Sequence, residues 1–368
     1  MGRSSFLALS LLACPACAVL VACSGGGALR PPTSDNQSDD PCDPGGGSTN
    51  TGPSPAIDAG AAPVPMPGGL AGIGFDDLRF SPTLAMLLVP AGRSGNIDLV
   101  DPSSEAVTPI GGFSSEATYT GDDSFGVTSA DEGNAIVYAV DRTSKTLVVV
   151  EPQTKTTLAH ATLAATPGYV RYVAPTNEVW VTEPSQQQIE VFALGTSAST
   201  APTHSTTIAV GGGPESLEID VTGLRAYTHA TSAIVAIDVM AHSVVASWPN
   251  GCATSRGIAV DSANKWVISA CQEGMVVVAT TQGATLGTVV VGAGVDQIAY
   301  DAQRTRLYVP GPAAAAMSVV SLAANGSPKV LGSVQTPSDT HCAVTNGGGS
   351  VYVCAPSAGA LLFIDDPF

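Results

Sequence analysis

The stretch "IAYDAQRTRLYVPGPAAAAMSVVSLAANGSPKVLGSV", residues 298–334, contains four short apolar segments with turn-forming residues between them. The segments are "IAYDA", "RLYVPG", "MSVVSL" and "KVLGSV", and they are rich in the β-branched and aromatic residues that favour strands. The connections are short enough for hairpins. The stretch therefore predicts one four-stranded antiparallel sheet made of consecutive hairpins.

This pattern recurs along most of the chain with a period of roughly 40 to 47 residues, which is typical of repeat architectures. A second, a third and a weaker fourth strand follow each opening strand, but the last unit ends after three. The seven openings are "LRFSP" at Leu78, "FGVTS" at Phe125, "VRYVA" at Val170, "LEIDV" at Leu217, "IAVDS" at Ile258, "IAYDA" at Ile298 and "CAVTN" at Cys342.

Repeated four-stranded units fit a β-propeller better than a sandwich or a barrel, because each propeller sheet buries both of its faces against its neighbours. Strands such as "MVVVAT", residues 275–280, are apolar on both faces, as this arrangement requires. We expect an all-β, seven-bladed propeller of four-stranded antiparallel blades. The expected blades span about 76–121, 122–167, 168–213, 214–254, 255–294, 295–339 and 340–368.

The last unit needs a fourth strand from the other end of the chain. The stretch "GGLAGIGFDD", residues 68–77, aligns with "VVVGAGVDQ", residues 289–297, where the fourth strand of one unit leads into the next unit. We therefore expect residues 66–72 to complete the seventh blade and remove an open sheet edge. On this basis the propeller domain spans residues 66–368.

The stretches "RLYVPGPAAAAMSVVSL" and "EVWVTEPSQQQIEVFAL" resemble the YVTN-type (YncE-like) propeller repeat. In that repeat Tyr-Val opens the second strand, and a V-S-V-I-D-like stretch makes the third. The resemblance covers nearly all of residues 76–368, and it implies the fold while saying little about function. Its core is degenerate here, as "YVPG", "WVTE", "YVCA" and "YTHA" show.

The N-terminus has the features of an export signal. Arg3 precedes an apolar run over residues 6–22, which is followed by small residues. The stretch "LVAC", ending at Cys23, resembles the lipobox of bacterial lipoproteins, although "LLAC", ending at Cys14, also fits. The resemblance implies a signal peptide over residues 1–22, a lipid on Cys23 and, with Ser24 following it, an outer-membrane location. Residues 23–65 are rich in Gly, Pro and Ser, and we expect a disordered tether there.

Five further cysteines follow in an exported, oxidising setting. Cys342 and Cys354 are equidistant from the centre of a Gly-rich turn, and Cys252 and Cys271 flank another turn symmetrically. Cross-strand neighbours lie within reach of a disulfide, so we expect the pairs Cys252–Cys271 and Cys342–Cys354. Zinc binding that involves His341 is the alternative, and Cys42 is left over in the tether.

Two residues stand just before each opening strand, in loops that converge on the mouth of the propeller channel. Four of the seven first positions are acidic, so repetition around the axis predicts a ring of carboxylates that could hold Ca²⁺ or a cationic ligand. The alternative is that these residues cap turns in water. The candidate ligand-binding residues are Asp76, Asp77, Asp123, Tyr169, Glu215, Arg256, Asp296 and His341, and the candidate metal ligands are Asp76, Asp123, Glu215 and Asp296.

Arg79, Arg171 and Glu218 occupy the second position of their opening strands, where other units have Gly or Ala. Charged side chains at this position suggest a polar wall along the channel, with a structural ion pair as the alternative.

A net charge of -17 repels phosphate backbones, so we expect no nucleic-acid partner. The sequence has no nucleophile elbow, no dinucleotide fingerprint and no P-loop. We expect a monomeric, non-enzymatic, lipid-anchored binding or scaffold module for a protein, a cell-wall component or a small ligand, with no cofactor apart from a possible Ca²⁺. The alternative is a propeller-class enzyme or cofactor binder, either a quinoprotein-like dehydrogenase or a metal-dependent lactonase, that uses the acidic mouth.

Overall fold

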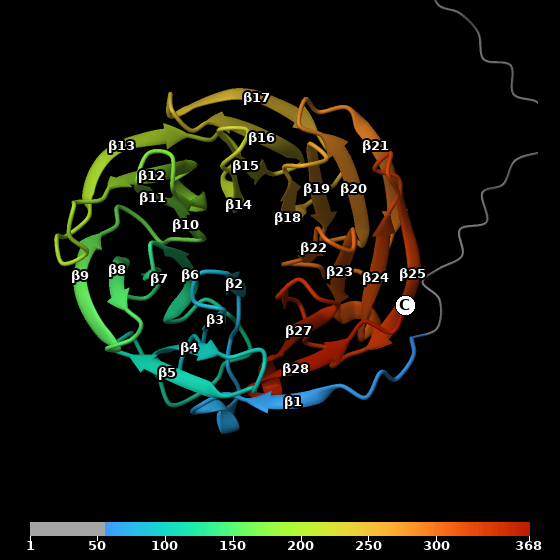
Figure 1. Cartoon of the computed structure of the whole chain (residues 1–368), viewed down its shortest axis with the longest axis horizontal. Helices are drawn as coiled ribbons and strands as arrows, with labels where there is room; N and C mark the ends of the chain where they lie inside the picture. The colour runs from blue at the N-terminus through green and yellow to red at the C-terminus, as the bar shows by residue number, and fades with distance from the viewer. Residues whose placement is uncertain (1–55) are drawn as a thin grey trace, which may run out of the picture. The chain divides into compact units, whose positions relative to one another are not determined.

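The computed structural model describes residues 56–368, which form a ring of seven four-stranded antiparallel sheets (Figure 1). Each sheet is one blade, with its first strand nearest the axis and its fourth on the outer rim. The predicted seven-bladed β-propeller is therefore confirmed. The predicted signal peptide 1–22, the lipidation site Cys23, the leftover Cys42 and most of the tether lie outside the described residues. No helix among the described residues has the length and apolar character needed to span a bilayer.

The first four blades use consecutive strands. Blade 1 contains β2 (Arg79–Ser81), β3 (Met86–Pro90), β4 (Asn96–Val100) and β5 (Val107–Gly111). Blade 2 contains β6 (Val127–Gly133), β7 (Ile136–Asp141), β8 (Thr146–Glu151) and β9 (Thr156–Thr162). Blade 3 contains β10 (Val170–Val173), β11 (Glu178–Glu183), β12 (Gln188–Ala193) and β13 (Thr203–Ala209). Blade 4 contains β14 (Pro214–Asp220), β15 (Arg225–Ala230), β16 (Ala233–Asp238) and β17 (Ser243–Pro249).

The last three blades complete the ring. Blade 5 contains β18 (Ser255–Asp261), β19 (Trp266–Cys271), β20 (Met275–Thr280) and β21 (Thr285–Val290). Blade 6 contains β22 (Ala299–Asp301), β23 (Arg306–Gly311), β24 (Ala316–Leu322) and β25 (Pro328–Gln335). Blade 7 contains β26 (Ala343–Thr345), β27 (Ser350–Ala355), β28 (Ala360–Asp365) and the N-terminal β1 (Ala62–Pro65). Single 3₁₀ turns occur at η1 (Gly69–Ala71), η2 (Pro184–Gln186), η3 (Pro312–Ala314) and η4 (Pro356–Ala358).

The apolar core lies between neighbouring blades. Between blades 3 and 4, for example, Trp180 and Val191 belong to the same buried cluster as Leu217 and Ile237. Each sheet therefore buries both faces, which explains why its middle strands are apolar throughout rather than alternating. The charged residues of the opening strands and their connections are left to face the axis.

The closing strand of blade 7 lies earlier in the chain than expected. It is β1, Ala62–Pro65, whose Val64 is opposite Leu361 of β28, whereas the sequence predicted residues 66–72. Residues 66–72 instead form a turn, with left-handed backbone at Gly68 (φ +77°) and Gly72 (φ +85°) around η1. A strand cannot continue through such a turn. The folded part therefore begins before residue 66, inside the segment expected to be tether.

The turn that follows β1 is held against blades 1 and 7. Arg93 is buried and donates hydrogen bonds to the carbonyl oxygens of Gly68 (2.8 Å) and Gly72 (2.6 Å). Gly69 lies against Gly359, and a Cβ atom at position 69 would come within 2.2 Å of the Gly359 carbonyl oxygen. Glycine is therefore required at this contact between the two ends of the propeller.

Both predicted disulfides are present. Cys252 pairs with Cys271 at a Cα–Cα distance of 5.2 Å, and Cys342 pairs with Cys354 at 5.6 Å. The second bond joins β27 to the residue before β26, in the blade that closes the ring. Because the sulfurs of Cys342 and Cys354 are bonded to each other, they are not free to bind zinc with His341.

Candidate binding site at the channel mouth

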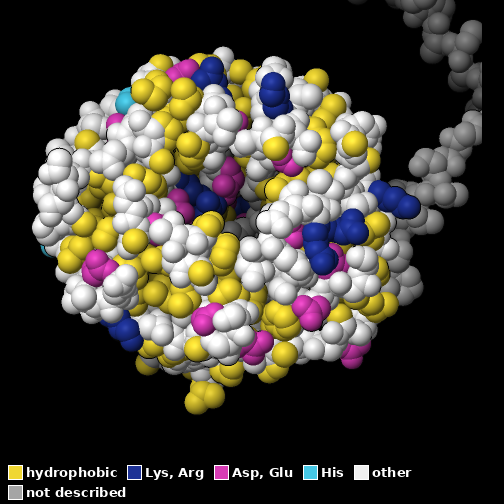
Figure 2. Space-filling model, in the orientation of Figure 1, with side chains coloured by type: hydrophobic (Ala, Val, Ile, Leu, Met, Phe, Trp, Pro, Cys, Tyr) yellow, Lys and Arg dark blue, Asp and Glu magenta, His cyan; other side chains and the backbone are white. Residues whose placement is uncertain are grey.

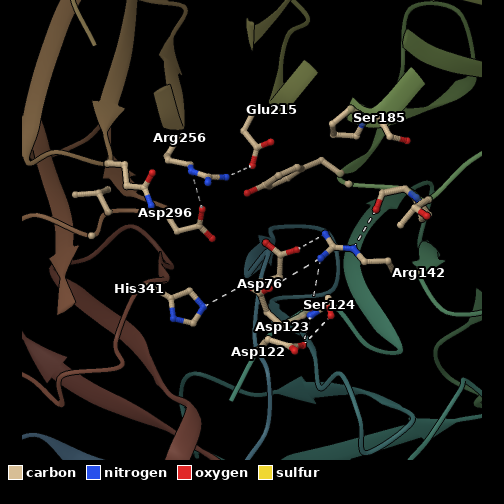
Figure 3. Close-up of a pocket in the computed structure, with 18 of the residues that line it drawn as sticks. Asp76, Asp122, Asp123, Ser124, Arg142, Ser185, Glu215, Arg256, Asp296 and His341 are labelled. Carbon is tan, nitrogen blue, oxygen red and sulfur yellow. Dashed lines mark hydrogen bonds and ion pairs between the residues drawn. The ribbon is translucent and has the colours of Figure 1, made fainter. Parts of the chain in front are cut away.

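The candidate site is a pocket of about 650 Å³ at one end of the channel. The connections that enter the first strands and the turns between second and third strands lie at the same end of the blades, because successive antiparallel strands reverse direction. Connections into all seven blades line the pocket, and Figure 3 shows their side chains pointing into a common space. Figure 2 shows the opposite end of the channel, where acidic and basic side chains also gather in the axial hollow.

Seven of the eight predicted mouth residues line this pocket. They are Asp76, Asp123, Tyr169, Glu215, Arg256, Asp296 and His341. The eighth, Asp77, is fully buried below the pocket, so its predicted position at the mouth is wrong. Asp77 bonds to Arg171 inside the channel, and an ion pair between blades cannot be read from the sequence.

One side of the pocket carries two linked ion pairs. Arg142 Nη2 lies 2.7 Å from Asp76 Oδ2, and Arg142 Nη1 lies 4.0 Å from Asp123 Oδ1. Burial raises the pKa of Asp76 well above its usual range, although Arg142 opposes that shift, and neighbouring carboxylates add to it. The pocket therefore holds Asp76 in an environment short of positive charge.

The opposite side is organised around Arg256. Its Nη1 lies 2.7 Å from Glu215 Oε1, and its Nε lies 3.9 Å from Asp296 Oδ1. Burial raises the pKa of Asp296 to about 6, with Asp123 and Glu215 adding to the shift and His341 and Arg256 opposing it. Asp296 therefore changes its charge close to neutral pH.

Both ring nitrogens of His341 contact carbonyl oxygens. Its Nδ1–H donates to the Asp339 carbonyl oxygen (2.8 Å) and its Nε2–H donates to the Phe75 carbonyl oxygen (2.8 Å). Since a carbonyl only accepts, a ring that makes both hydrogen bonds carries a proton on each nitrogen. Burial alone would lower the pKa of His341, but Asp296, the two carbonyls and Asp123 raise it.

The floor of the pocket is Tyr169, which is 5% exposed. Its ring also lines a second pocket of about 250 Å³ further along the channel, so it separates the two spaces. The Arg171 guanidinium carbon lies 5.3 Å from the ring centroid. Within residues 56–368 no hydrogen bond is made by the Tyr169 hydroxyl. Burial raises its pKa well above 10, and Asp76, Asp296, Asp77 and Glu215 add to this.

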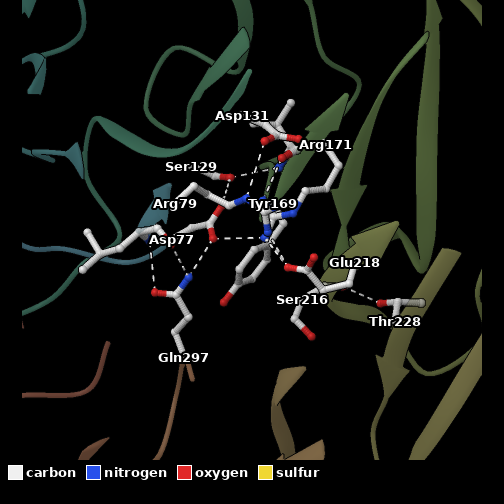
Figure 4. Close-up of polar contacts among 12 residues, drawn as sticks. Asp77, Arg79, Ser129, Asp131, Tyr169, Arg171, Ser216, Glu218, Thr228 and Gln297 are labelled. Atoms are coloured by element: carbon white, nitrogen blue, oxygen red, sulfur yellow. Dashed lines mark hydrogen bonds and ion pairs between the residues drawn. The ribbon is translucent and has the colours of Figure 1, made fainter. Parts of the chain in front are cut away.

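Beneath Tyr169 a charged network lies along the channel (Figure 4). Arg171 donates to both oxygens of Asp77, at 2.6 and 3.0 Å, and lies 3.4 Å from Glu218. Arg79 is bonded to Glu218 and lies 3.5 Å from Asp131. The predicted wall residues Arg79, Arg171 and Glu218 are thus brought together, and their contacts are those of a structural ion-pair cluster.

The four predicted metal ligands do not converge on one point. Asp76 and Glu215 are each occupied by an arginine. Asp123 and Asp296 do approach His341, with one potential ligand atom from each residue lying within 4.8 Å of the others. Both ring nitrogens of His341 face carbonyl oxygens, however, so His341 does not complete a set of ligands.

Sequence reasoning missed Arg142, which lies in the turn between β7 and β8, and Tyr119 and Asp122, which lie in the long connection into blade 2. The sequence analysis considered only the two residues before each opening strand. The turns between second and third strands face the same mouth, and including them would have identified Arg142.

No protein-family model and no curated protein sequence matches this chain. Solved structures match at the level of fold. A chain of the mitotic checkpoint complex is 15% identical, with 92% of this chain and 98% of that chain covered and a TM-score of 0.65. The β-propeller domain of Cps50 (Swd1) from Myceliophteria thermophila is 9% identical, with 80% of this chain and 96% of that chain covered and a TM-score of 0.66. Kuenenia stuttgartiensis hydrazine synthase is 13% identical, with 80% of this chain and 96% of that chain covered and a TM-score of 0.63. Identities this low establish a shared fold alone.

Proposed function

We propose that this protein is a non-enzymatic binding module, and that the mouth pocket is its recognition site. The observation that carries the proposal is the pocket itself. Connections of several blades line it, and Tyr169 lies between it and the second pocket further along the channel. Its volume of about 650 Å³ lies in the range of roughly 300–1,000 Å³ that is typical of ligand sites.

Binding suits the chemistry of the mouth better than catalysis does. Asp76 and Glu215 are paired with arginines, and both ring nitrogens of the one histidine at the mouth lie 2.8 Å from carbonyl oxygens, which leaves neither free to accept a proton from a ligand. The matched folds themselves do not decide between the two, since one belongs to the mitotic checkpoint complex and another to hydrazine synthase. The argument therefore rests on the site.

We further propose that the chain is a divergent YVTN-type propeller, anchored through a lipid on Cys23 to the outer membrane and working as a monomer. The lipobox resemblance and the Gly/Ser-rich stretch after it support this placement. A tether of this kind would hold the mouth away from the bilayer, where it can meet a protein, a cell-wall component or a small ligand.

Site-specific photo-crosslinking in the native envelope tests the recognition role. A crosslinking amino acid at Ser124, exposed at the mouth, is compared with one at Gln303, exposed in the turn between β22 and β23 at the opposite end. We expect adducts of discrete size from position 124 and none of the same size from position 303. Identical adduct patterns at the two positions, or none at the mouth, would count against the proposal.

A further inference from the structure

We infer that the mouth pocket binds an organic cation, an ammonium or guanidinium group that reaches the hydroxyl of Tyr169. The inference rests on the proposed function, because it assigns a ligand class to the same pocket. The ligand chemistry is shared by a lysine or arginine side chain of a peptide and by a free small amine.

The charge of the pocket favours a cation. Five carboxylates line it, from Asp76, Asp122, Asp123, Glu215 and Asp296, against three cations, from Arg142, Arg256 and His341. The cations are already engaged. Arg142 and Arg256 are paired with carboxylates, and His341 donates to carbonyl oxygens. An anion would therefore meet an excess of carboxylates, and the cationic groups that could bind it are already paired.

The Tyr169 hydroxyl is a second observation, independent of the acidic lining. The Tyr169 residue is only 5% exposed and lines the pocket. Its hydroxyl has no hydrogen-bond partner among the described residues. The carboxylates that raise its pKa, Asp76, Asp296 and Glu215, stand around it. An N–H donor placed there satisfies the phenol oxygen and the carboxylates together.

A bare divalent cation fits less well. Calcium needs six to eight oxygen ligands at about 2.3–2.6 Å. Among the described residues that line the pocket, Asp123 and Asp296 are the carboxylates that converge in a close cluster, and both ring nitrogens of its third member, His341, face carbonyl oxygens. The pocket is also much larger than one ion, whereas an ammonium on an alkyl chain would use the aromatic ring of Tyr169 as well, through cation–π attraction.

Calorimetric titration of the full chain tests the inference. The probes are a Gly-Gly-Lys-Gly-Gly peptide, the same peptide with Nε-acetyl-lysine, 1,5-diaminopentane, and CaCl₂ alone. We expect the lysine peptide or the diamine to bind with one site per chain, and the acetylated peptide to bind at least about tenfold more weakly, a change equivalent to about 1.4 kcal/mol. Binding of the peptide alone identifies a peptide source, and binding of the diamine alone identifies a small amine.

Variants locate the site. Asp296→Asn and Tyr169→Phe each weaken cation binding, whereas Asp365→Asn, which removes the same charge from an exposed position at the end of β28, leaves it unchanged. Equal loss in all three variants, binding of CaCl₂ without either amine, or no amine binding at all overturns the inference. The comparison of the lysine peptide with the acetyl-lysine peptide uses the unmodified chain, so it tests the inference even if a variant fails to fold. Adducts from position 124 without amine binding would overturn the ligand class while leaving the proposed function in place.

Discussion

Arg171 of blade 3 donates two hydrogen bonds to the carboxylate of Asp77, which precedes blade 1, and both side chains are almost completely buried. This pair joins two blades that have blade 2 between them, rather than direct neighbours. Gln297, which precedes blade 6, donates to the same carboxylate at 3.0 Å. The axial network therefore ties together blades that share no sheet contact, and it supports the floor of the mouth pocket.

Breaking this pair should destabilise the fold strongly. Arg171→Met leaves the buried Asp77 carboxylate without its partner, which typically costs about 3–5 kcal/mol. The double variant Arg171→Met/Asp77→Asn removes both charges and should recover part of the loss. Denaturant unfolding measures both. As a control, Arg225→Met breaks the partly exposed Arg225–Asp238 pair and should cost no more than about 1 kcal/mol. Equal losses of unfolding free energy for Arg171→Met and Arg225→Met would show that the axial pair stabilises the fold no more than a partly exposed pair does.

Closure of the ring by β1 gives a second prediction. Deleting residues 24–55 should leave the free energy of unfolding unchanged, whereas deleting 24–66 removes β1 and Met66. Burial of Val64 and Met66 is worth about 1.5–3 kcal/mol for each side chain, so the longer deletion should cost at least about 3 kcal/mol. Thermal and denaturant unfolding of the two exported proteins provide the comparison. Indistinguishable melting curves would mean that β1 does not close the ring.

Asp98 of β4 predicts a pH dependence of stability. Its side chain is fully buried with no hydrogen bond to either oxygen among the described residues, and burial raises its pKa to about 7. The folded state then holds a proton that the unfolded chain has already released, so stability falls as pH rises from about 4 to about 7. Between about pH 5 and about pH 8 this group should account for a loss of about 3 kcal/mol.

Asp98→Asn cannot ionise and should remove this component. The measurement is the free energy of unfolding of both proteins at the two pH values, because the difference between them cancels the other titrating groups. If wild type and variant lose the same stability as pH rises, Asp98 does not carry the effect.

The anchoring hypothesis concerns residues outside the described part of the chain. Cys23→Ser should abolish incorporation of labelled palmitate and release the protein from the membrane fraction. Cys14→Ser changes the other lipobox-like cysteine and serves as the matched control, with label expected to persist. Loss of label in the Cys14 variant alone would place the lipid at position 14.

The repeat predicted the blades because each strand is marked locally, by segments such as "RLYVPG" between short turns. The cysteine pairs were predictable for the same reason, since a hairpin brings residues equidistant from its turn together. The closing strand was predicted too late in the chain because residues 68–72 form a turn, with the 3₁₀ segment Gly69–Ala71, before the chain enters blade 1. Asp77 was misplaced because its partner Arg171 is distant in sequence, and only the closed ring brings the two together.

The account's central claim is that the acidic mouth binds an organic cation, and the pH dependence of binding tests it most directly. An ammonium group remains charged up to about pH 10, so the change in affinity reports the pocket. Since the pKa of Asp296 is raised to about 6, the lysine peptide should bind about tenfold more weakly at about pH 5 than at about pH 7.5. This difference should shrink in Asp296→Asn. An affinity that is independent of pH, or that strengthens on acidification, would contradict the claim.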